Sequence, residues 1–425
     1  MNEATSGSSA LDPAFAYGTR KWLLIASLGA VFFVLLTLYV AVLNVLLPNQ
    51  IQDLDPASKE TNLGIVFAIT SIFSTTITPL SGALSDRTRT RFGRRTPWIA
   101  VGATIGGIAI ILVPFGNDLV SITAIWLVAA ISLNSMQTPV LTAIAERVAP
   151  EERGVAAGVV GAAMTAGVSA GTIYGGLLAH DIRVAYFLLG VGIIVACWAF
   201  VLLNPEPRTH NSPAPPLKLG AFLASFWVSP KEYPDFAWAF MGRFTIYMGY
   251  QAIVTYLFYI LQEHIGLTQS DANQTIARLA SITFVALVFA GVTSGWLSDA
   301  IRRRKPIVFG AGLFMTAAVA APLVAPSMPG MIAYAVLIGL GYGAFMSVDL
   351  ALMTQVLPKK PGADDSTGKD LGILSTAINV PQILSPMLAA VLLGATGNNY
   401  SLLFVAAGTF VLVGSFLVLP IRTVR

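Results

Sequence analysis

Two charged residues lie deep inside long apolar stretches of this sequence, where charge is unfavourable and therefore informative. Asp349 comes nine residues before Pro358, and Arg243 comes eight residues after Asp235. At a helical rise of about 1.5 Å per residue, they would lie about 13 Å and about 12 Å in from the nearest polar end. A carboxylate in such a place can take up and release a proton, so both residues are candidates for proton coupling.

Eight uncharged polar residues in the apolar stretches form a second set of candidates. Amide groups can bind the hydroxyl groups of a sugar, and aromatic rings can stack on its faces. We therefore consider these residues for contact with a small polar solute. The alternative is hydrogen bonding between helices, which is common for Asn and Gln in membranes. The set comprises Asn44, Asn134, Gln137, Tyr250, Gln251, Tyr256, Asn379 and Gln382.

Signatures of enzymes and metal sites are missing from the sequence. Its one cysteine, Cys197, lies in an apolar run and permits no internal disulfide. The three histidines show no metal-ligand spacing, and no HExxH, Walker A or GxSxG motif occurs. We therefore expect neither an enzyme nor a bound metal or cofactor.

The composition indicates that the chain is solvated by a lipid bilayer. Of its 425 residues, 55% are hydrophobic and 11% are charged, against about 25% charged in a soluble domain. The mean hydropathy is +0.74. The net charge of +4 does not indicate nucleic acid, because the Lys and Arg residues lie in short loops beside apolar runs. Such a distribution reports membrane topology.

Twelve apolar runs are long enough to cross a bilayer, for which a helix needs about 20 residues. The first is too long for a signal peptide and lacks a cleavage site, so we expect it to be retained. The runs cover residues 22–47, 62–84, 97–115, 119–146, 154–177, 184–203, 235–261, 276–298, 306–325, 330–357, 372–395 and 400–420.

The distribution of basic residues predicts the orientation of these spans. All but four of the 25 Lys and Arg residues fall on one side, the exceptions being Lys59, Arg183, Arg243 and Arg278. Loops rich in Lys and Arg are usually cytoplasmic. With an even number of spans, both termini are therefore expected in the cytoplasm.

Two loops on that side carry nearly the same sequence. Residues 82–97 read GALSDRTRTRFGRRTP, and residues 295–306 read GWLSDAIRRRKP. Pro97 and Pro306 are offset by 209 positions, and Pro150 and Pro358 by 208. This agreement predicts a duplicated architecture with six spans in each half.

A Pro-rich segment of mixed charge separates the two halves. We expect its middle, Leu217–Val228, to form an amphipathic helix on the membrane surface. The predicted organisation is a cytoplasmic tail (1–21), an N-terminal six-helix bundle (22–203), a cytoplasmic linker (204–234), a C-terminal six-helix bundle (235–420) and a C-terminal tail (421–425).

The repeated loops of this 6+6 chain resemble those of the major facilitator superfamily, and the resemblance covers essentially the whole chain. The longer copy, SDRTRTRFGRRTPW, is similar to that of the glycoside–pentoside–hexuronide and sucrose-type cation symporters. The resemblance implies an all-α membrane fold of twelve helices in two pseudo-symmetric bundles. It also places spans 1, 4, 7 and 10 around a central cavity.

The resemblance further implies a cytoplasmic gate in which acids of one half face helix starts of the other. Asp86 would face Lys369–Gly372, and Asp299 would face Arg153 and Gly154. Arg residues of the two loops would pair with acids such as Glu146 or Glu152; the alternative is that they only set orientation. The gate set comprises Gly82, Asp86, Arg87, Arg94, Arg95, Glu146, Arg153, Gly295, Asp299 and Arg303.

On this arrangement, Arg243 and Asp349 lie at similar depth on two cavity helices. We hypothesise an ion pair that protonation of Asp349 releases; the alternative is a permanent bridge between spans 7 and 10. Melibiose-type symporters carry acidic sodium ligands in spans 2 and 4. Span 2 here has no acid, and span 4 has none before Glu146, so we expect H⁺ as the driving ion.

The expected function is secondary transport by alternating access, with proton-coupled uptake of a sugar or another small polar solute. One alternative is a proton-coupled exporter of drugs or metabolites, for which an apolar, aromatic cavity would be typical. Another is a membrane sensor or scaffold without transport activity. We expect a multi-pass, monomeric protein of the cell (plasma or inner) membrane.

Overall fold

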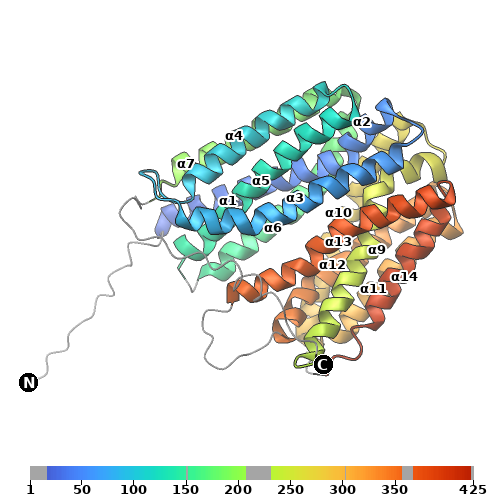
Figure 1. The fold of residues 1–425 in the computed structure, drawn as a ribbon. Helices are drawn as coiled ribbons and strands as arrows, with labels where there is room; N and C mark the ends of the chain where they lie inside the picture. The colour runs from blue at the N-terminus through green and yellow to red at the C-terminus, as the bar shows by residue number, and fades with distance from the viewer. Residues whose placement is uncertain (1–16, 150–151, 207–230, 302, 357–366, 423–425) are drawn as a thin grey trace, which may run out of the picture.

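The computed structural model describes residues 17–149, 152–206, 231–301, 303–356 and 367–422, and it is all-helical (Figure 1). The N-terminal half contains α1 (Gly18–Ala41), the π-helical turn η1 (Val42–Leu46), α2 (Leu47–Leu54), α3 (Lys59–Arg87), α4 (Thr96–Leu112), α5 (Leu119–Arg147), α6 (Arg153–Leu178) and α7 (Ile182–Leu203). The C-terminal half contains α9 (Pro234–Tyr259), the π-helical turn η5 (Ile260–His264), α10 (Gln269–Ile301), α11 (Lys305–Val324), α12 (Met328–Val356), α13 (Thr367–Thr396) and α14 (Tyr400–Phe416).

Each predicted span corresponds to a helix. Within the described residues, nine helical segments are long and apolar enough to cross a membrane, and one of them, Arg153–Leu203, contains both α6 and α7. Shorter apolar segments lie in α13 and α14. The predicted surface helix at 217–228 lies outside the described residues.

Two span boundaries lie seven residues from their predicted positions. The first span continues through η1 and α2 to Leu54 instead of ending at 47. Pro48 does not stop it; this proline directly follows the π-helical turn η1, where the regular α-helical hydrogen-bond pattern is already interrupted. The other boundary is the start of α10, which lies at Gln269 instead of 276. Its first turns are polar, so a search for apolar runs does not include them.

Local sequence signals set several helix starts. Asp118 forms a capping box with Ser121 at the start of α5, and Asn399 accepts a hydrogen bond from the Leu402 N–H at the start of α14. Pro97 and Pro306 lie in the first turns of α4 and α11, where a missing N–H does no harm. The repeated loops therefore end in the same kind of helix start.

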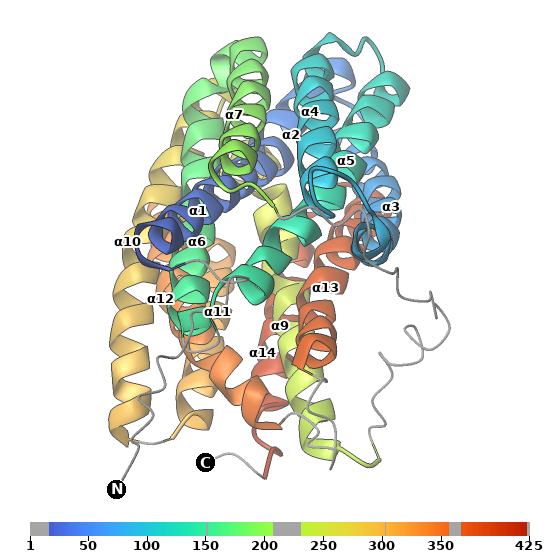
Figure 2. The same cartoon turned by 90° about the vertical axis from the view of Figure 1, so that its left-hand side faces the viewer.

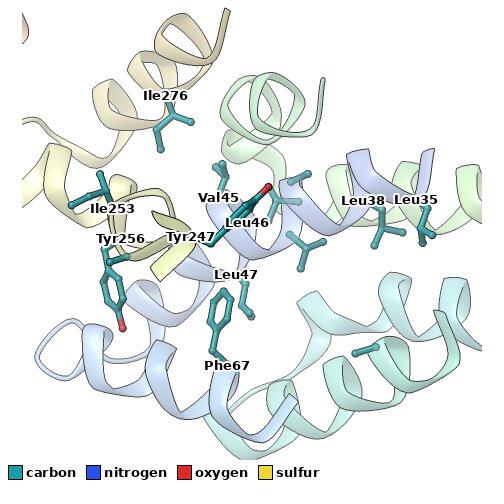
Figure 3. Packing of buried hydrophobic residues seen from close by; sticks show 14 of the residues in the cluster. Leu35, Leu38, Val45, Leu46, Leu47, Phe67, Tyr247, Ile253, Tyr256 and Ile276 are labelled. Carbon is teal, nitrogen blue, oxygen red and sulfur yellow. The ribbon is translucent and has the colours of Figure 1, made fainter. Parts of the chain in front are cut away.

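The helices form two bundles that meet at one end. We name the end that carries the two repeated loops the cytoplasmic end, after the charge prediction, and the opposite end the extracellular end. In Figure 1 the bundles approach each other at the extracellular end and spread apart toward the cytoplasmic end. Figure 2, in which the left-hand side of Figure 1 faces the viewer, shows most of the N-terminal bundle above the C-terminal bundle. Buried apolar residues of both bundles join in one cluster, and Figure 3 shows Leu46 and Leu47 in the middle of the view, with Ile253 and Tyr256 to their left.

Candidate coupling and substrate site

Arg243 of α9 and Asp349 of α12 lie side by side in the C-terminal bundle. Arg243 Nε is 3.1 Å from Asp349 Oδ2, and each side chain is only 5% exposed. The contact is electrostatic, because these two atoms and Arg243 Nη1 have no aligned hydrogen-bond partner among the described residues. The pair therefore retains capacity to bind a proton or a polar ligand.

Aromatic side chains surround this ion pair. Tyr247 and Tyr342 have their hydroxyl oxygens 3.3 Å apart, and Tyr247 also donates to Met346 Sδ at 3.0 Å. The rings of Tyr250 and Tyr342 stack with centroids 4.5 Å apart, and Phe345 packs edge-on to Tyr247. We refer to Tyr247, Tyr250, Tyr342 and Phe345 as the aromatic cluster.

Sequence reasoning identified only Tyr250 of this cluster. Helical spacing could have found the others, because residues four or seven apart share a helix face. Tyr247 follows Arg243 by four positions, and Phe345 and Tyr342 precede Asp349 by four and seven.

A second aromatic pair lies on spans 1 and 4 of the N-terminal bundle. The rings of Tyr39 and Trp126 pack edge-on with centroids 6.5 Å apart. Trp126 is buried and Tyr39 is half-buried, and Tyr39 Oη and Trp126 Nε1 lack a hydrogen-bond partner among the described residues. These two polar atoms are further candidates for a substrate, and sequence reasoning did not single them out.

The predicted substrate residues are dispersed. Asn134 donates to Ser74 Oγ and to the Ala130 carbonyl, and Gln251 donates to Thr255 Oγ1. Asn44 and Gln137 are half-buried, Gln382 is exposed, and the side chain of Asn379 lies outside the described residues. Their substrate contacts stay predictions.

Tyr256 lies far from the ion pair, about 20 Å along α9 from Arg243 by the helical rise. Its hydroxyl donates to the carbonyl oxygens of Glu60 and Pro386. It therefore joins α9 to α3 and α13 near the extracellular end.

The gate residues of the first loop pair within their own bundle. Arg95 Nη2 lies 2.5 Å from Asp86 and 2.6 Å from Glu146, and Arg94 lies 2.7 Å from Glu146. Burial by itself would lower the pKa of Arg95, but Glu146 and Asp86 hold it above its ordinary value, so the guanidinium stays charged. This cluster ties α3, α4 and α5 together at the cytoplasmic end.

The other predicted gate residues have separate surroundings. A Cβ at Gly82 would lie 3.2 Å from Thr138, and one at Gly295 would lie 2.8 Å from Ser347. Arg87 is half-buried, Arg153 donates to the Val148 carbonyl, and Arg303 is exposed. The side chains of Asp299 and of Lys369–Gly372 lie outside the described residues. The latch between bundles stays a prediction.

Arg95 supplies a test of the cytoplasmic cluster. We expect Arg95→Ala to lower the free energy of unfolding by about 1–3 kcal/mol, because Glu146 and Asp86 lose a buried cation but remain partly hydrated. Arg94→Ala, at a side chain that is 34% exposed, should lower it by less than about 1 kcal/mol. Unfolding of the two purified variants measures both values, and equal losses would contradict the central role of Arg95.

Charged residues join the two bundles at the extracellular end. Lys59 of α3 lies 2.5 Å from Glu263, and its ammonium is 5.2 Å from the ring centroid of Tyr259. Tyr400 of α14 donates to the Glu60 carboxylate at 2.8 Å. Lys59 and Glu60 are both buried. We name Lys59, Glu60, Glu263 and Tyr400 the extracellular seal.

Amide side chains add to this seal on its other flank. Asn49 and Asn273 exchange two hydrogen bonds of 2.8 and 2.9 Å between α2 and α10, and Gln52 donates to Gln262 at 2.7 Å. The two bundles are thus bonded at the extracellular end, while Arg95 and its acids bond inside one bundle. On the predicted orientation, the cytoplasmic end is the open one. Sequence reasoning missed these residues, because their partners are more than 200 positions away.

The chain belongs to the Major Facilitator Superfamily. The family model matches residues 28–362 and again 240–425, an overlap that agrees with two similar halves. The chain is therefore a member of a family of multi-pass membrane transporters.

Individual relatives are more distant. A fujikurins efflux protein from Gibberella fujikuroi is 27% identical over 242 residues, which cover 56% of this chain and 47% of that protein. Among solved structures, an inward-facing, occupied bacterial homologue of the human lysosomal transporter Spinster aligns with a TM-score of 0.72 at 14% identity, covering 96% of this chain and 98% of that one. A D-xylose–proton symporter aligns with a TM-score of 0.64 at 15% identity, covering 95% and 98%.

Proposed function

We propose that this chain is a proton-coupled secondary transporter of the cell membrane that works by alternating access. The observation that carries the proposal is the Arg243–Asp349 pair, buried between two helices of a bundle and in contact with no third charged group among the described residues. A buried pair of this kind changes its interactions strongly when one partner is neutralised. Protonation of Asp349 would therefore change the contact between the two helices and so affect the rest of the molecule.

The proposed cycle uses one proton and one ion pair. When Asp349 is ionised, it neutralises Arg243 and the pair is closed. Protonation of Asp349 removes the attraction, so Arg243 and its free Nη1 become available to a polar group of the substrate. Rocking of the bundles then opens the opposite end.

We infer that the substrate is a small organic solute with at least one ring face. Tyr250 and Tyr342 offer ring faces and hydroxyl groups beside the ion pair. A sugar or glycoside fits this combination, in line with the resemblance of the SDRTRTRFGRRTPW loop to sugar symporters. Uptake with protons is the first candidate function.

Export is the second candidate, and one observation favours it. The neighbours of the ion pair are predominantly aromatic, with Phe345 and Met346 beside the tyrosines, a surface typical of sites for apolar compounds. The efflux protein of Gibberella fujikuroi gives further support.

Opposite proton gradients across proteoliposomes distinguish the two candidates. A symporter moves solute in the direction of the proton, so an acidic exterior should drive accumulation inside the vesicle. An exporter that exchanges solute for protons should accumulate solute only when the interior is acidic. A panel of sugars and aromatic compounds is measured in both gradients. No response to either gradient for a compound that the protein exchanges would contradict proton coupling.

A further inference from the structure

The outward face of α10 changes character along its length. Its first turns expose polar side chains, and its later turns expose apolar ones. The polar part comprises Ser270, Gln274, Arg278 and Ser281. The apolar part comprises Val285, Phe289, Val292 and Trp296, each between 63% and 73% exposed. A helix that faces lipid is expected to be apolar, so the polar part requires an explanation.

A cavity of about 780 Å³ lies beside this polar part, at the extracellular end. The N-terminal bundle contributes Leu177 and His180 to its wall, and α10 contributes Gln274, Arg278 and Ser281. At its inner edge the bundles touch, because a Cβ at Gly176 would lie 2.5 Å from the Asn273 carbonyl oxygen. The cavity is therefore built across the seam between α6 and α10.

Arg278 is the arginine among the described residues that line this cavity, and Asn49 and His180 of the same lining already have partners. Asn49 is bonded to Asn273 and to Gln269, while His180 Nδ1 lies 2.9 Å from the Leu177 carbonyl oxygen. The neighbouring carboxylates accept hydrogen bonds at chain turns: Asp53 from Gln269, Asp271 from Thr268 and Asp181 from the Val184 N–H. Arg278 forms no ion pair with a described residue.

The depth of Arg278 matches that of a lipid headgroup. From Arg278 to the cytoplasmic end of α10 at Ile301, the helical rise gives about 34 Å, and the hydrocarbon core of a bilayer is about 30 Å thick. The guanidinium therefore lies near the extracellular boundary of the hydrocarbon, directly before the exposed apolar face begins.

We propose that this cavity binds an acidic phospholipid of the extracellular leaflet. Arg278 pairs with the phosphate, for which a guanidinium is well matched, and the acyl chains follow the apolar face of α10 from Val285 to Trp296. The continuity of polar cavity and apolar face favours a lipid over a soluble anion. Because both bundles form the wall, the bound lipid stabilises the closed extracellular end.

A lipid titration of the purified protein tests this proposal. Short-chain phosphatidylglycerol should raise the unfolding midpoint of the wild type in a saturable way, since a ligand stabilises the state that binds it. In Arg278→Gln the shift should fall by more than half. Arg183→Gln is the matched control, because Arg183 is an exposed arginine at the same end that packs on Phe115 instead. It should respond like the wild type.

Two further probes distinguish an acidic phospholipid from free phosphate and from a zwitterionic lipid. Inorganic phosphate and short-chain phosphatidylcholine should each give less than half of the phosphatidylglycerol shift. An equal shift with inorganic phosphate would identify a site for free anions, and an equal shift with phosphatidylcholine would exclude recognition of acidic lipid. Either result overturns the proposal.

A second variant tests the proposal if Arg278→Gln does not fold. Ser281→Phe fills the cavity and keeps its charge, so it should also lose most of the phosphatidylglycerol response. A full response in either folded variant overturns the proposal. The measurement requires no transported substrate, so its outcome is independent of the proposed transport function.

Discussion

Asp349→Asn is expected to abolish proton-driven accumulation of substrate while exchange of substrate continues. At a stoichiometry of one proton, a gradient of one pH unit supports about tenfold accumulation, and the variant should reach no more than the external concentration. Asparagine keeps the size and the polarity of the side chain but cannot ionise. Accumulation and exchange are measured in the same proteoliposomes, and accumulation by the variant would refute the coupling role.

A double variant distinguishes coupling from a permanent bridge. Asp349→Asn alone leaves Arg243 buried without its partner charge, which commonly lowers the free energy of unfolding by about 3–5 kcal/mol. Arg243→Gln with Asp349→Asn removes both charges and should recover much of that loss. If the pair only holds α9 and α12 together, the double variant should also regain proton-driven accumulation. If the pair couples protons, accumulation stays absent.

Gly64→Leu is expected to prevent closure of the extracellular end. Gly64 of α3 faces α13, and a Cβ at this position would clash with Ala390 Cβ. Overpacking typically costs about 1–3 kcal/mol, which shifts the balance between inward- and outward-facing states by roughly fivefold to a hundredfold. Transport should fall by a similar factor, since the cycle must pass through the closed extracellular state.

Spin labels at the cytoplasmic end measure this shift directly. Leu84 of α3 and Leu297 of α10 are both exposed, and Cys197 is the only native cysteine, so labels at Leu84→Cys and Leu297→Cys in a Cys197→Ala background report one distance. Gly64→Leu should shorten it. Gly310→Leu is the control, because a Cβ at Gly310 meets nothing within 4 Å. Unchanged distances in Gly64→Leu would contradict the proposed closure.

Much of the fold is predictable because its signals are local. A span requires about 20 apolar residues in succession, and a helix start requires a cap or a proline within a few positions, so α4, α5 and α11 begin within one residue of their predicted positions. The start of α10 was missed by seven residues, because its polar face serves a cavity that only the neighbouring α6 completes.

For the candidate site, the sequence by itself identified Asp349 and Arg243, since charge is rare in apolar runs wherever the chain folds. The sequence could not assign a bonding partner to a polar side chain that has several chemically suitable partners. Asp86 pairs with Arg95 of its own bundle, and Tyr256 bonds across the bundles. An Asp or a Tyr could form either kind of contact, within a bundle or between bundles.

The extracellular seal is a further feature that the sequence alone does not predict. Lys59 and Glu263 are ordinary loop charges in the sequence, and only the packing of the two bundles brings them into contact and buries Lys59. Composition and repeats determined that two bundles exist, because they depend on each segment separately. The tertiary structure decided which end is closed, because two arrangements of the same helices differ by only a few kcal/mol.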